Sequence, residues 1–483
     1  MRTGALMRGG VLLACTPLLG PVESQQPSLS TPPNVIILLM DDLGYGDIGS
    51  YGAPDVRTPN IDRLAREGVR LTDFYANGAN CSPTRTALIT GQYQQRFAIE
   101  APLPPGTDFG LRPSNTSLPH LLRRRGYATA LIGKWHLGQE PAFHPNKHGF
   151  DEFWGFLGPA VDYYSHDWTP GSAGGTSERN RTHHDLYDND RLITTAGYLT
   201  DEITTKAKAF IEAHRDRPFF IDVSYNATHW PFQPPDLPEK KRPREDVVRD
   251  GTRAEYVAML ERADRGVGEI LDLLDGLQLA GNTLVIFTSD NGGEWLSRNA
   301  PLFHRKSTLW EGGIRVPALL RWPGQLPAGT VSKQVGITMD LTVSILAAAG
   351  VSTPTSYRPD GINLLPLLQN GRTIERTLFW RIKSEGRDQK AVRKGRWKYL
   401  RDGVGVFDGL HEFIYDLEED VGERQDLAAA KTGLVVEMRK LLQQWEADVG
   451  PANAPRPPPN KPLLQTPHTL KVGRRALRHD GHL

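Results

Sequence analysis

The stretch CSPTRTALITG at residues 81–91 combines a reactive side chain with the marks of a short helix. Ser82 is a good N-cap residue, Pro83 suits the first helical position, and Gly91 suits the left-handed position just past a helix end. We therefore expect Cys81 at the mouth of a helix. Unpaired backbone N–H groups and the positive end of the helix dipole favour an anion there. The stretch thus predicts an anion-binding site.

Cys81 could be a thiolate nucleophile, and the position of Arg85 bears on this. A helix mouth lowers the pKa of a cysteine thiol, as in thiol-dependent phosphatases. Those enzymes carry their arginine at the far end of a longer phosphate-cradling loop, whereas Arg85 follows four residues after Cys81. The spacing therefore disfavours a thiolate mechanism. A structural cysteine ahead of a helix and a different cysteine chemistry remain as interpretations.

Other polar side chains follow runs of residues that are typical of buried strands. Asp41 and Asp42 come directly after NVIILLM, and Asp290 and Asn291 come after TLVIFTS. Such β-branched and apolar runs fit strands that are buried on both faces of a parallel sheet. Open α/β sheets bind their ligands at the carboxyl ends of these strands. We therefore expect the four side chains to converge, although the first pair taken alone could also be a solvated loop.

The four converging side chains are hard oxygen donors. No cysteine or histidine cluster with zinc-like spacing accompanies them in the sequence, so calcium or magnesium is expected rather than zinc. Crowding of several carboxylates with an amide favours calcium. A cation at this point would also offset the repulsion between the acids.

Length, charge and cysteine content limit the class of protein. The 483 residues suffice for one large α/β domain and a smaller one, and 57 basic against 56 acidic residues give no sign of a nucleic-acid binder. A small-molecule or glycan partner is therefore expected. No apolar run after the N-terminal region is long enough to span a bilayer.

Residues 1–24 have the features of a secretory signal peptide. Arg2 and Arg8 precede the apolar run VLLAC, and small residues follow it. We expect export to the periplasm or the extracellular space, with lipid attachment at Cys15 as an alternative because LLAC resembles a lipobox. Removal of the signal would leave Cys81 as the one remaining cysteine, so no intramolecular disulfide could form.

The order of elements predicts the fold class. Helical and strand patterns alternate, which indicates an α/β domain with a large, mostly parallel sheet covered by helices over residues 32–370. From residue 371 to 452, short alternating runs and a final amphipathic pattern predict a smaller antiparallel sheet plus a helix. Residues 453–483 read as a poorly ordered tail. An irregular segment, residues 139–197, is expected to face the substrate with the aromatic and histidine side chains Tyr163, Tyr164, His166, Trp168, His183 and His184.

Six motifs in order resemble those of the type I sulfatases, an arylsulfatase-like family of the alkaline phosphatase superfamily. They are DDLGYGD, CSPTR, GKWHLG, a histidine before a proline turn, SDNGG, and a lysine ahead of EGG, within residues 34–450. The resemblance implies an alkaline-phosphatase-like fold and hydrolysis of sulfate monoesters of a carbohydrate or an aryl alcohol. Alternatives are a phosphonate or phosphate ester hydrolase on the same fold, and a non-catalytic binder of sulfated glycans.

The resemblance also implies two cofactors. During maturation, a formylglycine-generating enzyme would oxidise Cys81 to formylglycine, whose hydrated aldehyde is the nucleophile in this family. The formylglycine side chain would also contact a calcium ion. The implied ligands of that ion are Asp41, Asp42, Cys81 after conversion, Asp290 and Asn291.

Roles for the remaining motif residues follow from the same resemblance. Arg85 would hold and orient the formylglycine. Lys134 and Lys306 would grip the sulfate oxygens. His136 would act as a base on the second hydroxyl of the nucleophile, and His229 would protonate the leaving alcohol. Histidine suits both proton transfers because its ordinary pKa lies near neutrality.

Overall fold

The computed structural model describes residue 1 and residues 32–168, 183–236, 250–384, 387–402 and 409–451. The predicted signal peptide and the predicted tail lie almost wholly outside these residues, so both stay predictions. Among the helices that are described, none combines the length and the apolar character that crossing a bilayer requires.

A large mixed sheet forms the centre of the fold. Its strands run in the order β13-β2-β12-β11-β1-β10-β4-β5-β8-β9. The middle of the sheet is parallel and consists of β11 (Thr283–Ser289), β1 (Asn34–Met40), β10 (Phe219–Ser224), β4 (Ala128–Lys134) and β5 (Glu152–Phe156). These strands are mostly continuous apolar runs because both of their faces are buried. The predicted large, mostly parallel sheet is confirmed.

Antiparallel pairing occurs towards the two edges of this sheet. On one side, β12 (Ala318–Arg321) is antiparallel to both β11 and β2 (Val69–Leu71), and β13 (Thr330–Ser332) then pairs with β2 in parallel. On the other side, β8 (Tyr187–Asp188) is antiparallel to both β5 and β9 (Arg191–Leu192). The chain after β2 leaves the sheet, and β3 (Phe74–Tyr75) pairs instead with β14 (Gly336–Ile337). A separate short pair joins β6 (Asp167–Trp168) to β7 (His183–His184).

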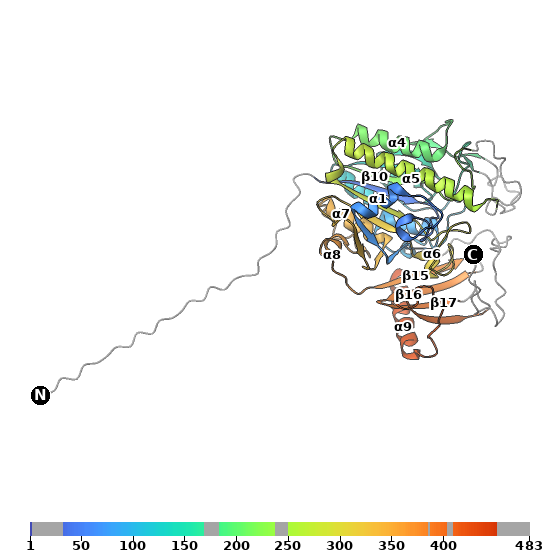
Figure 1. The fold of residues 1–483 in the computed structure, drawn as a ribbon, viewed down its shortest axis with the longest axis vertical. Coiled ribbons are helices and arrows are strands. Elements are labelled where there is room, and N and C mark those ends of the chain that lie inside the picture. The colour runs from blue at the N-terminus through green and yellow to red at the C-terminus, as the bar shows by residue number, and fades with distance from the viewer. Residues whose placement is uncertain (2–31, 169–182, 237–249, 385–386, 403–408, 452–483) are drawn as a thin grey trace. The chain divides into compact units, whose positions relative to one another are not determined.

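Helices cover both faces of the large sheet. One face carries α1 (Pro59–Glu67), α4 (Leu199–Ala213) and α5 (Arg253–Gly276), and the other carries α2 (Cys81–Thr90), α3 (Leu118–Arg124), α7 (Thr338–Ala348) and α8 (Leu365–Gln369). Figure 1 shows α4 and α5 side by side on their face. Alternate residues of β1 enter the two cores, Ile36 and Leu38 on the first face and Val35 and Ile37 on the second. This alternation follows from the two-residue period of a strand.

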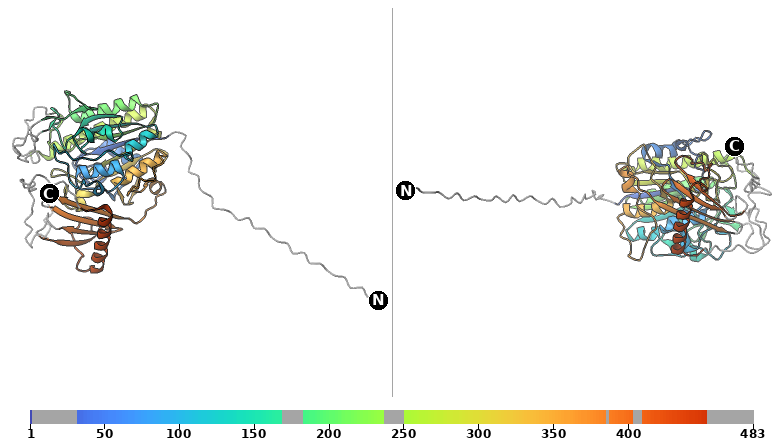
Figure 2. Two further views of the ribbon diagram at one scale, coloured as in Figure 1. Left: turned by 180° about the vertical axis from the view of Figure 1, so that it is seen from behind. Right: turned by 90° about the horizontal axis from the view of Figure 1, so that it is seen from below.

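A second, antiparallel sheet follows in the chain. It contains β15 (Thr377–Ser384), β16 (Arg387–Lys394), β17 (Trp397–Asp402) and β18 (His411–Asp416), with α9 (Thr432–Val449) packed against it. Figure 2 shows α9 lying across this sheet. The predicted small antiparallel sheet plus helix is confirmed, while the residue limits assigned to each domain stay predictions.

The smaller sheet shares a hydrophobic core with β3 and with loops and helices of the larger part. Tyr75 and Trp310 from the larger part pack in one cluster with Trp380 and Tyr399 from the smaller sheet. The short helix α6 (Glu311–Ile314) belongs to this junction, and Figure 1 shows it beside β15. Short 3₁₀ helices complete the described elements at Gly49–Tyr51, Gln94–Phe97, Pro141–Phe143, Pro145–His148 and Ala280–Asn282.

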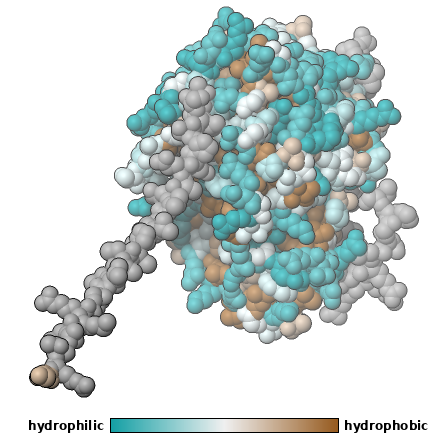
Figure 3. All heavy atoms as spheres, turned by 60° about the vertical axis from the view of Figure 1, so that its left-hand side comes forward, coloured by the Kyte–Doolittle hydropathy of each residue, from teal (hydrophilic) through white to brown (hydrophobic). Residues whose placement is uncertain are grey.

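The surface seen in Figure 3 is mainly hydrophilic, with hydrophobic residues scattered between polar ones. Large apolar side chains that are exposed include Val331, Ile374 and Val436. Exposed apolar residues of this kind are common on soluble domains and assign no function by themselves.

Candidate active site

The helix that carries Cys81 begins earlier than the sequence predicts. It starts at Cys81 rather than at Pro83, and Asn80 instead of Ser82 occupies the N-cap position. The prediction of Ser82 as the cap is wrong because its Oγ accepts a hydrogen bond from the Leu103 N–H at 3.0 Å. Cys81 therefore lies in the first turn of α2, where it is buried.

Two pairs of polar residues that follow β1 and β11 lie together, namely Asp41 with Asp42 and Asp290 with Asn291. The strands are parallel neighbours, with Met40 aligned to Ser289, so the next residues of both strands emerge at one edge. The Asn291 Nδ2 donates to Asp42 Oδ1 at 2.7 Å, and the Asp42 N–H donates to Asp290 Oδ1 at 3.4 Å. The convergence predicted from the sequence is confirmed as geometry.

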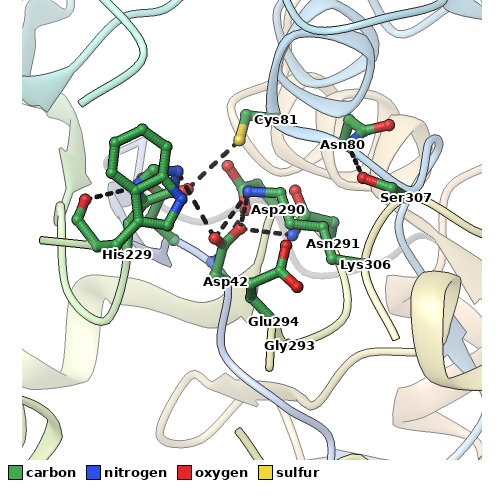
Figure 4. A network of polar contacts seen from close by, with 12 residues as sticks. Asp42, Asn80, Cys81, His229, Asp290, Asn291, Gly293, Glu294, Lys306 and Ser307 are labelled. Carbon is green, nitrogen blue, oxygen red and sulfur yellow. Dashed lines mark hydrogen bonds and ion pairs between the residues drawn. The ribbon is translucent and has the colours of Figure 1, made fainter. Parts of the chain in front are cut away.

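Cys81 reaches the same edge from α2. Its Sγ lies 3.5 Å from Asp41 Oδ1 and 3.5 Å from the Lys134 Nζ. Lys134, the last residue of β4, is fully buried, and its Nζ lies 2.6 Å from Asp41 Oδ2. Figure 4 shows the Cys81 sulfur on the side of its helix that faces Asp42 and Asp290. The helix, β1 and β4 thus bring a sulfur, a carboxylate and an ammonium group into contact.

The side chain of Arg85 ties α2 to the ends of several strands. Its Nε donates to Asp290 Oδ2 at 3.0 Å, and its Nη1 donates to the Lys134 carbonyl at 2.9 Å and to Ser224 Oγ at 2.5 Å. Burial disfavours the charged guanidinium, but Asp290 and then Asp41 outweigh it and raise the pKa of Arg85. Arg85 is therefore a fixed cation at the carboxyl ends of the strands.

Lys306 enters from the long loop after β11. Its Nζ lies 2.6 Å from Asp42 Oδ1 and 2.7 Å from Oδ2. The residue after it anchors this loop to the start of α2, because the Ser307 N–H donates to the Ala79 carbonyl at 2.8 Å and Asn80 Nδ2 donates to Ser307 Oγ at 2.7 Å. Figure 4 shows this pair beside Cys81 and Lys306. No local pattern predicts the contact between Asn80 and Ser307, because the two residues are 227 positions apart in the chain.

His136 has the hydrogen bonding of a neutral base. Its Nε2 lies 3.0 Å from the Leu103 carbonyl, which can only accept, so Nε2 carries the proton. The other ring nitrogen, Nδ1, is buried and has no hydrogen-bond partner among the described residues. Burial, reinforced by Lys134, holds the pKa of His136 well below its ordinary value. The imidazole is therefore neutral with a free lone pair on Nδ1.

Figure 4 shows His229 on the other side of Asp42 from Lys306. Its Nδ1 donates to the Trp230 carbonyl at 2.7 Å, and its Nε2 lies 3.6 Å from Asp42 Oδ2. Burial, only partly offset by Asp42, lowers the pKa of His229 to about 3. The turn is supported by Tyr163, whose hydroxyl donates to the carbonyls of Asn226 at 2.8 Å and His229 at 2.9 Å.

The segment expected to face the substrate contributes differently from the prediction. Tyr163 and His166 are buried, and Tyr163 supports the His229 turn instead of lining an open surface. Tyr164 is half-buried and donates to the Pro234 carbonyl at 2.8 Å. The side chains of Trp168 and His183 lie outside the described residues. A substrate contact from this segment stays a prediction.

Cys81 as an unmodified thiol is not activated by this environment. Burial, followed by the charge of Asp290, raises the pKa of the Cys81 thiol well above its ordinary value, against the opposing effect of Lys134 and Lys306. A thiolate, the form that attacks, is therefore disfavoured. This agrees with the spacing of Arg85, which already weighs against a thiol-dependent phosphatase.

The donor set fits a hard cation. Asp41, Asp42, Cys81 and His229 each offer a ligand atom, and these atoms lie within 4.8 Å of one another. Asn291 Oδ1 is buried without a hydrogen-bond partner among the described residues, as expected of an oxygen that is kept for a metal ion. His229 is an additional candidate that the sequence did not suggest as a ligand. The carboxylate and amide oxygens favour a hard divalent cation over zinc.

The fold and the site combine an α/β sheet with buried lysine and arginine side chains and a possible metal site at the carboxyl ends of its strands. The family described as Sulfatase matches residues 33–351, and that described as N-sulphoglucosamine sulphohydrolase, C-terminal, matches residues 301–448. The chain belongs to the sulfatase family and is a sulfuric ester hydrolase.

Characterised relatives match over most of their length. N-acetylgalactosamine-6-sulfatase of Homo sapiens is 39% identical, with 87% of each chain covered. Arylsulfatase A of Homo sapiens is 33% identical over 87% of this chain and 88% of its own. The crystal structure of Ps i-CgsB in complex with k-i-k-neocarrahexaose is 31% identical, has a TM-score of 0.79, and covers 88% of this chain and 95% of that one. These similarities agree with the alkaline-phosphatase-like fold that the motifs imply.

Proposed function

We propose that this chain is an exported, calcium-dependent sulfatase that removes sulfate from a carbohydrate, or from an aryl alcohol, by means of a formylglycine made from Cys81. The names of similar proteins support a sugar substrate, since one is a sulfatase of N-acetylgalactosamine and another is crystallised with neocarrahexaose. Export rests on the N-terminal sequence alone, with the periplasm or the extracellular space as the destination.

The observation that carries the proposal is the contact between Cys81 and Lys134 at the carboxylate edge. A sulfate monoester is anionic and repels nucleophiles, so the nucleophile must lie among cations. Cys81 Sγ lies 3.5 Å from Lys134 Nζ, in the first turn of a helix whose N–H groups favour anions. Lys306, on the loop after β11, places a second ammonium group beside Asp42.

Asp41, Asp42, Asp290 and Asn291 would hold the calcium ion, together with the modified residue 81. When bound, the ion would neutralise the carboxylates and polarise a sulfate oxygen. In the structure, Lys134 and Lys306 are the counter-ions of Asp41 and Asp42. Both ammonium groups thus lie beside the implied metal ligands, and in the proposed mechanism they would hold the sulfate oxygens there.

His136 and His229 would carry out different proton transfers. His136 accepts a proton at Nδ1, because Nε2 is committed to the Leu103 carbonyl. His229 donates from Nε2 to the leaving oxygen, because Nδ1 is committed to the Trp230 carbonyl. The charge of a bound sulfate ester would favour the protonated form of His229, whose pKa in the free site is low. The formylglycine hydrate would supply two hydroxyl groups on one carbon, one for attack and one whose deprotonation expels sulfate.

The test compares turnover of an aryl sulfate, an aryl phosphate and an aryl phosphonate by the enzyme and by Cys81→Ala. The protein must be produced in a host that contains a formylglycine-generating enzyme. We expect the sulfate to be the preferred substrate and the variant to be inactive. Preference for the phosphate or phosphonate would support an ester hydrolase of the other class. Sulfate release that Cys81→Ala leaves unchanged would overturn the proposed mechanism.

A further inference from the structure

The motif Glu311-Gly312-Gly313 follows Lys306 closely, but the proposed reaction gives it no role. The Gly312 N–H donates to the Phe303 carbonyl at 2.8 Å, which closes the loop around Lys306. A Cβ atom on Gly313 would lie 2.0 Å from the Thr308 carbonyl, so glycine is required by the close approach of the backbone. Residues 303–313 therefore form one tightly packed loop, and its position fixes the origin of the Lys306 side chain.

Glu311, at the end of this loop, is held by residues of the smaller sheet and of the chain beyond it. Lys398, on β17, places its Nζ 2.9 Å from Glu311 Oε1 and 2.7 Å from Glu423 Oε1. Glu423 Oε2 in turn accepts the backbone N–H of Glu311 at 2.7 Å. All three side chains are 0% exposed. The Lys398 ammonium group thus binds two buried carboxylates. One is that of Glu311 itself, and the other is that of Glu423, which also accepts the Glu311 N–H.

A second strand of the smaller sheet contacts the same loop. Gln389, on β16, is fully buried, and its Oε1 accepts the Leu309 N–H at 3.0 Å. The loop is thus held from the smaller sheet at residues 309 and 311, while Ser307 is held from the other side by Ala79 and Asn80. Lys306 lies between these two sets of contacts.

Polar groups from the larger part complete the surroundings of Glu311. Its Oε2 accepts from the Tyr75 hydroxyl at 2.6 Å and lies 3.2 Å from Arg315 Nη1. Burial alone would raise the pKa of Glu311, but Lys398 and then Arg315 lower it to about 2. Glu311 is therefore a charged anchor whose main counter-ion comes from the smaller sheet.

We propose that Lys398 is a positioning residue for the sulfate-binding lysine: through Glu311 it fixes the loop that carries Lys306, with Gln389 as a second contact. The smaller sheet would then be part of the catalytic apparatus, although none of these side chains touches the carboxylate edge. This inference rests on the proposed role of Lys306 in gripping sulfate. It predicts that loss of Lys398 acts by displacing the Lys306 ammonium group. Displacements of about 1 Å can lower a catalytic rate about 100-fold.

A double-mutant cycle tests this coupling. It compares the enzyme, Lys398→Met, Lys306→Ala and the double variant, with kcat/KM for an aryl sulfate and the calorimetric affinity for inorganic sulfate as readouts. We expect Lys398→Met to lower both by roughly 10-fold to 100-fold in the presence of Lys306, and by less than about 2-fold when Lys306 is already replaced. Equal losses in both backgrounds would overturn the proposal, because Lys398 would then act independently of Lys306.

Two further variants keep the test decisive. Lys394→Met removes an exposed lysine of the same sheet that pairs with Glu437, and we expect no change in either readout. Gln389→Leu deletes only the acceptor for Leu309, so the same cycle can be run with it if Lys398→Met fails to fold. If the enzyme turns over no sulfate ester, the proposed function fails, whereas the sulfate-affinity cycle still decides whether Lys398 and Lys306 are coupled.

Discussion

Two clusters of buried charge in this molecule differ in how completely their members are paired. We call the edge of the large sheet where Asp41, Asp42, Asp290 and Asn291 lie the catalytic edge. There, Asn291 Oδ1 and His136 Nδ1 are buried without a hydrogen-bond partner among the described residues. At the junction of the two sheets, both carboxylate oxygens of Glu311 have partners, and Lys398 pairs with Glu311 and Glu423. We call the latter three residues the junction triad.

This difference separates a cluster that is open to ligands from a cluster that holds a loop in place. Buried polar atoms without partners are costly unless a ligand satisfies them, and under the proposed function a cation and an anion would satisfy those at the catalytic edge. In the junction triad, by contrast, Lys398 pairs with both buried carboxylates, and the contacts end on the backbone and side chain of residue 311. We therefore expect variants of the first cluster to change chemistry at nearly constant stability, and variants of the second to change stability first.

The largest expected effect on activity is that of Cys81→Ala. Removing the residue that becomes the nucleophile should lower kcat for an aryl sulfate by on the order of 10³-fold or more. The thermal unfolding midpoint should change by only a few degrees, since the side chain is small. Steady-state kinetics and calorimetry on the same preparation measure both. Activity within about 10-fold of the unsubstituted enzyme would contradict the assignment.

The largest expected effect on stability is that of Lys398→Met. The substitution leaves Glu311 and Glu423 without their shared cation in a buried position, which should cost about 3–5 kcal/mol in the free energy of unfolding. The matched variant Lys394→Met, which breaks a partly exposed pair with Glu437, should cost far less, because water and salt screen such a pair. Urea unfolding measures both values. Equal costs for the two variants would mean that the junction triad is not the anchor described above.

Removal of the metal ion should affect the catalytic edge alone. A chelator should abolish turnover, and calcium should restore it. Saturating calcium at about 100 times its Kd should add about 2.7 kcal/mol to the free energy of unfolding, because the ion binds only the folded chain. Asp42→Asn should weaken this stabilisation, whereas Glu437→Gln, far from the site in the chain, should not. A chelated enzyme with full activity would contradict the metal assignment.

The smallest expected effect is a pH dependence of the junction triad. Burial, only partly offset by Lys398, raises the pKa of Glu423 to about 7 from 4.5. The folded chain therefore keeps a proton that the unfolded chain has lost, and the contribution of Glu423 to stability falls as pH rises from about 4.5 to about 7. The unfolding free energy of the enzyme, relative to that of Glu423→Gln, should fall by roughly 1–3 kcal/mol over this range. A difference that stays constant or rises with pH would refute the raised pKa.

The fold and the catalytic edge were accessible to sequence reasoning because their signals are local. A buried strand and the polar residues after it are contiguous in the chain, as in the run that ends at Asp41 and Asp42, and parallel pairing then brings such ends together. The signal for the C-terminal end of α2 is equally local, since Gly91 has the expected left-handed φ of 68°. The order of the six motifs, through its resemblance to the sulfatases, indicated hydrolysis of a sulfate ester.

Features that depend on distant pairs could not be predicted. Lys398 and Glu311 are 87 positions apart, and Asn80 and Ser307 are 227 apart. No spacing rule relates such residues, because the fold alone decides which side chains meet. The start of α2 was misplaced for the same reason, since the partner of Ser82 is the N–H of Leu103 and not of its own helix.

In the proposed mechanism, residue 81 is chemically converted before it acts, at an edge where cations and a metal ion would receive a sulfate ester. Intact-mass spectrometry of the peptide that spans residue 81, from enzyme of known specific activity, tests it most directly. We expect the thiol sulfur to be replaced by a carbonyl oxygen in a fraction of molecules that rises in proportion to the activity. Full sulfatase activity from protein in which every Cys81 is an unmodified thiol would contradict the claim.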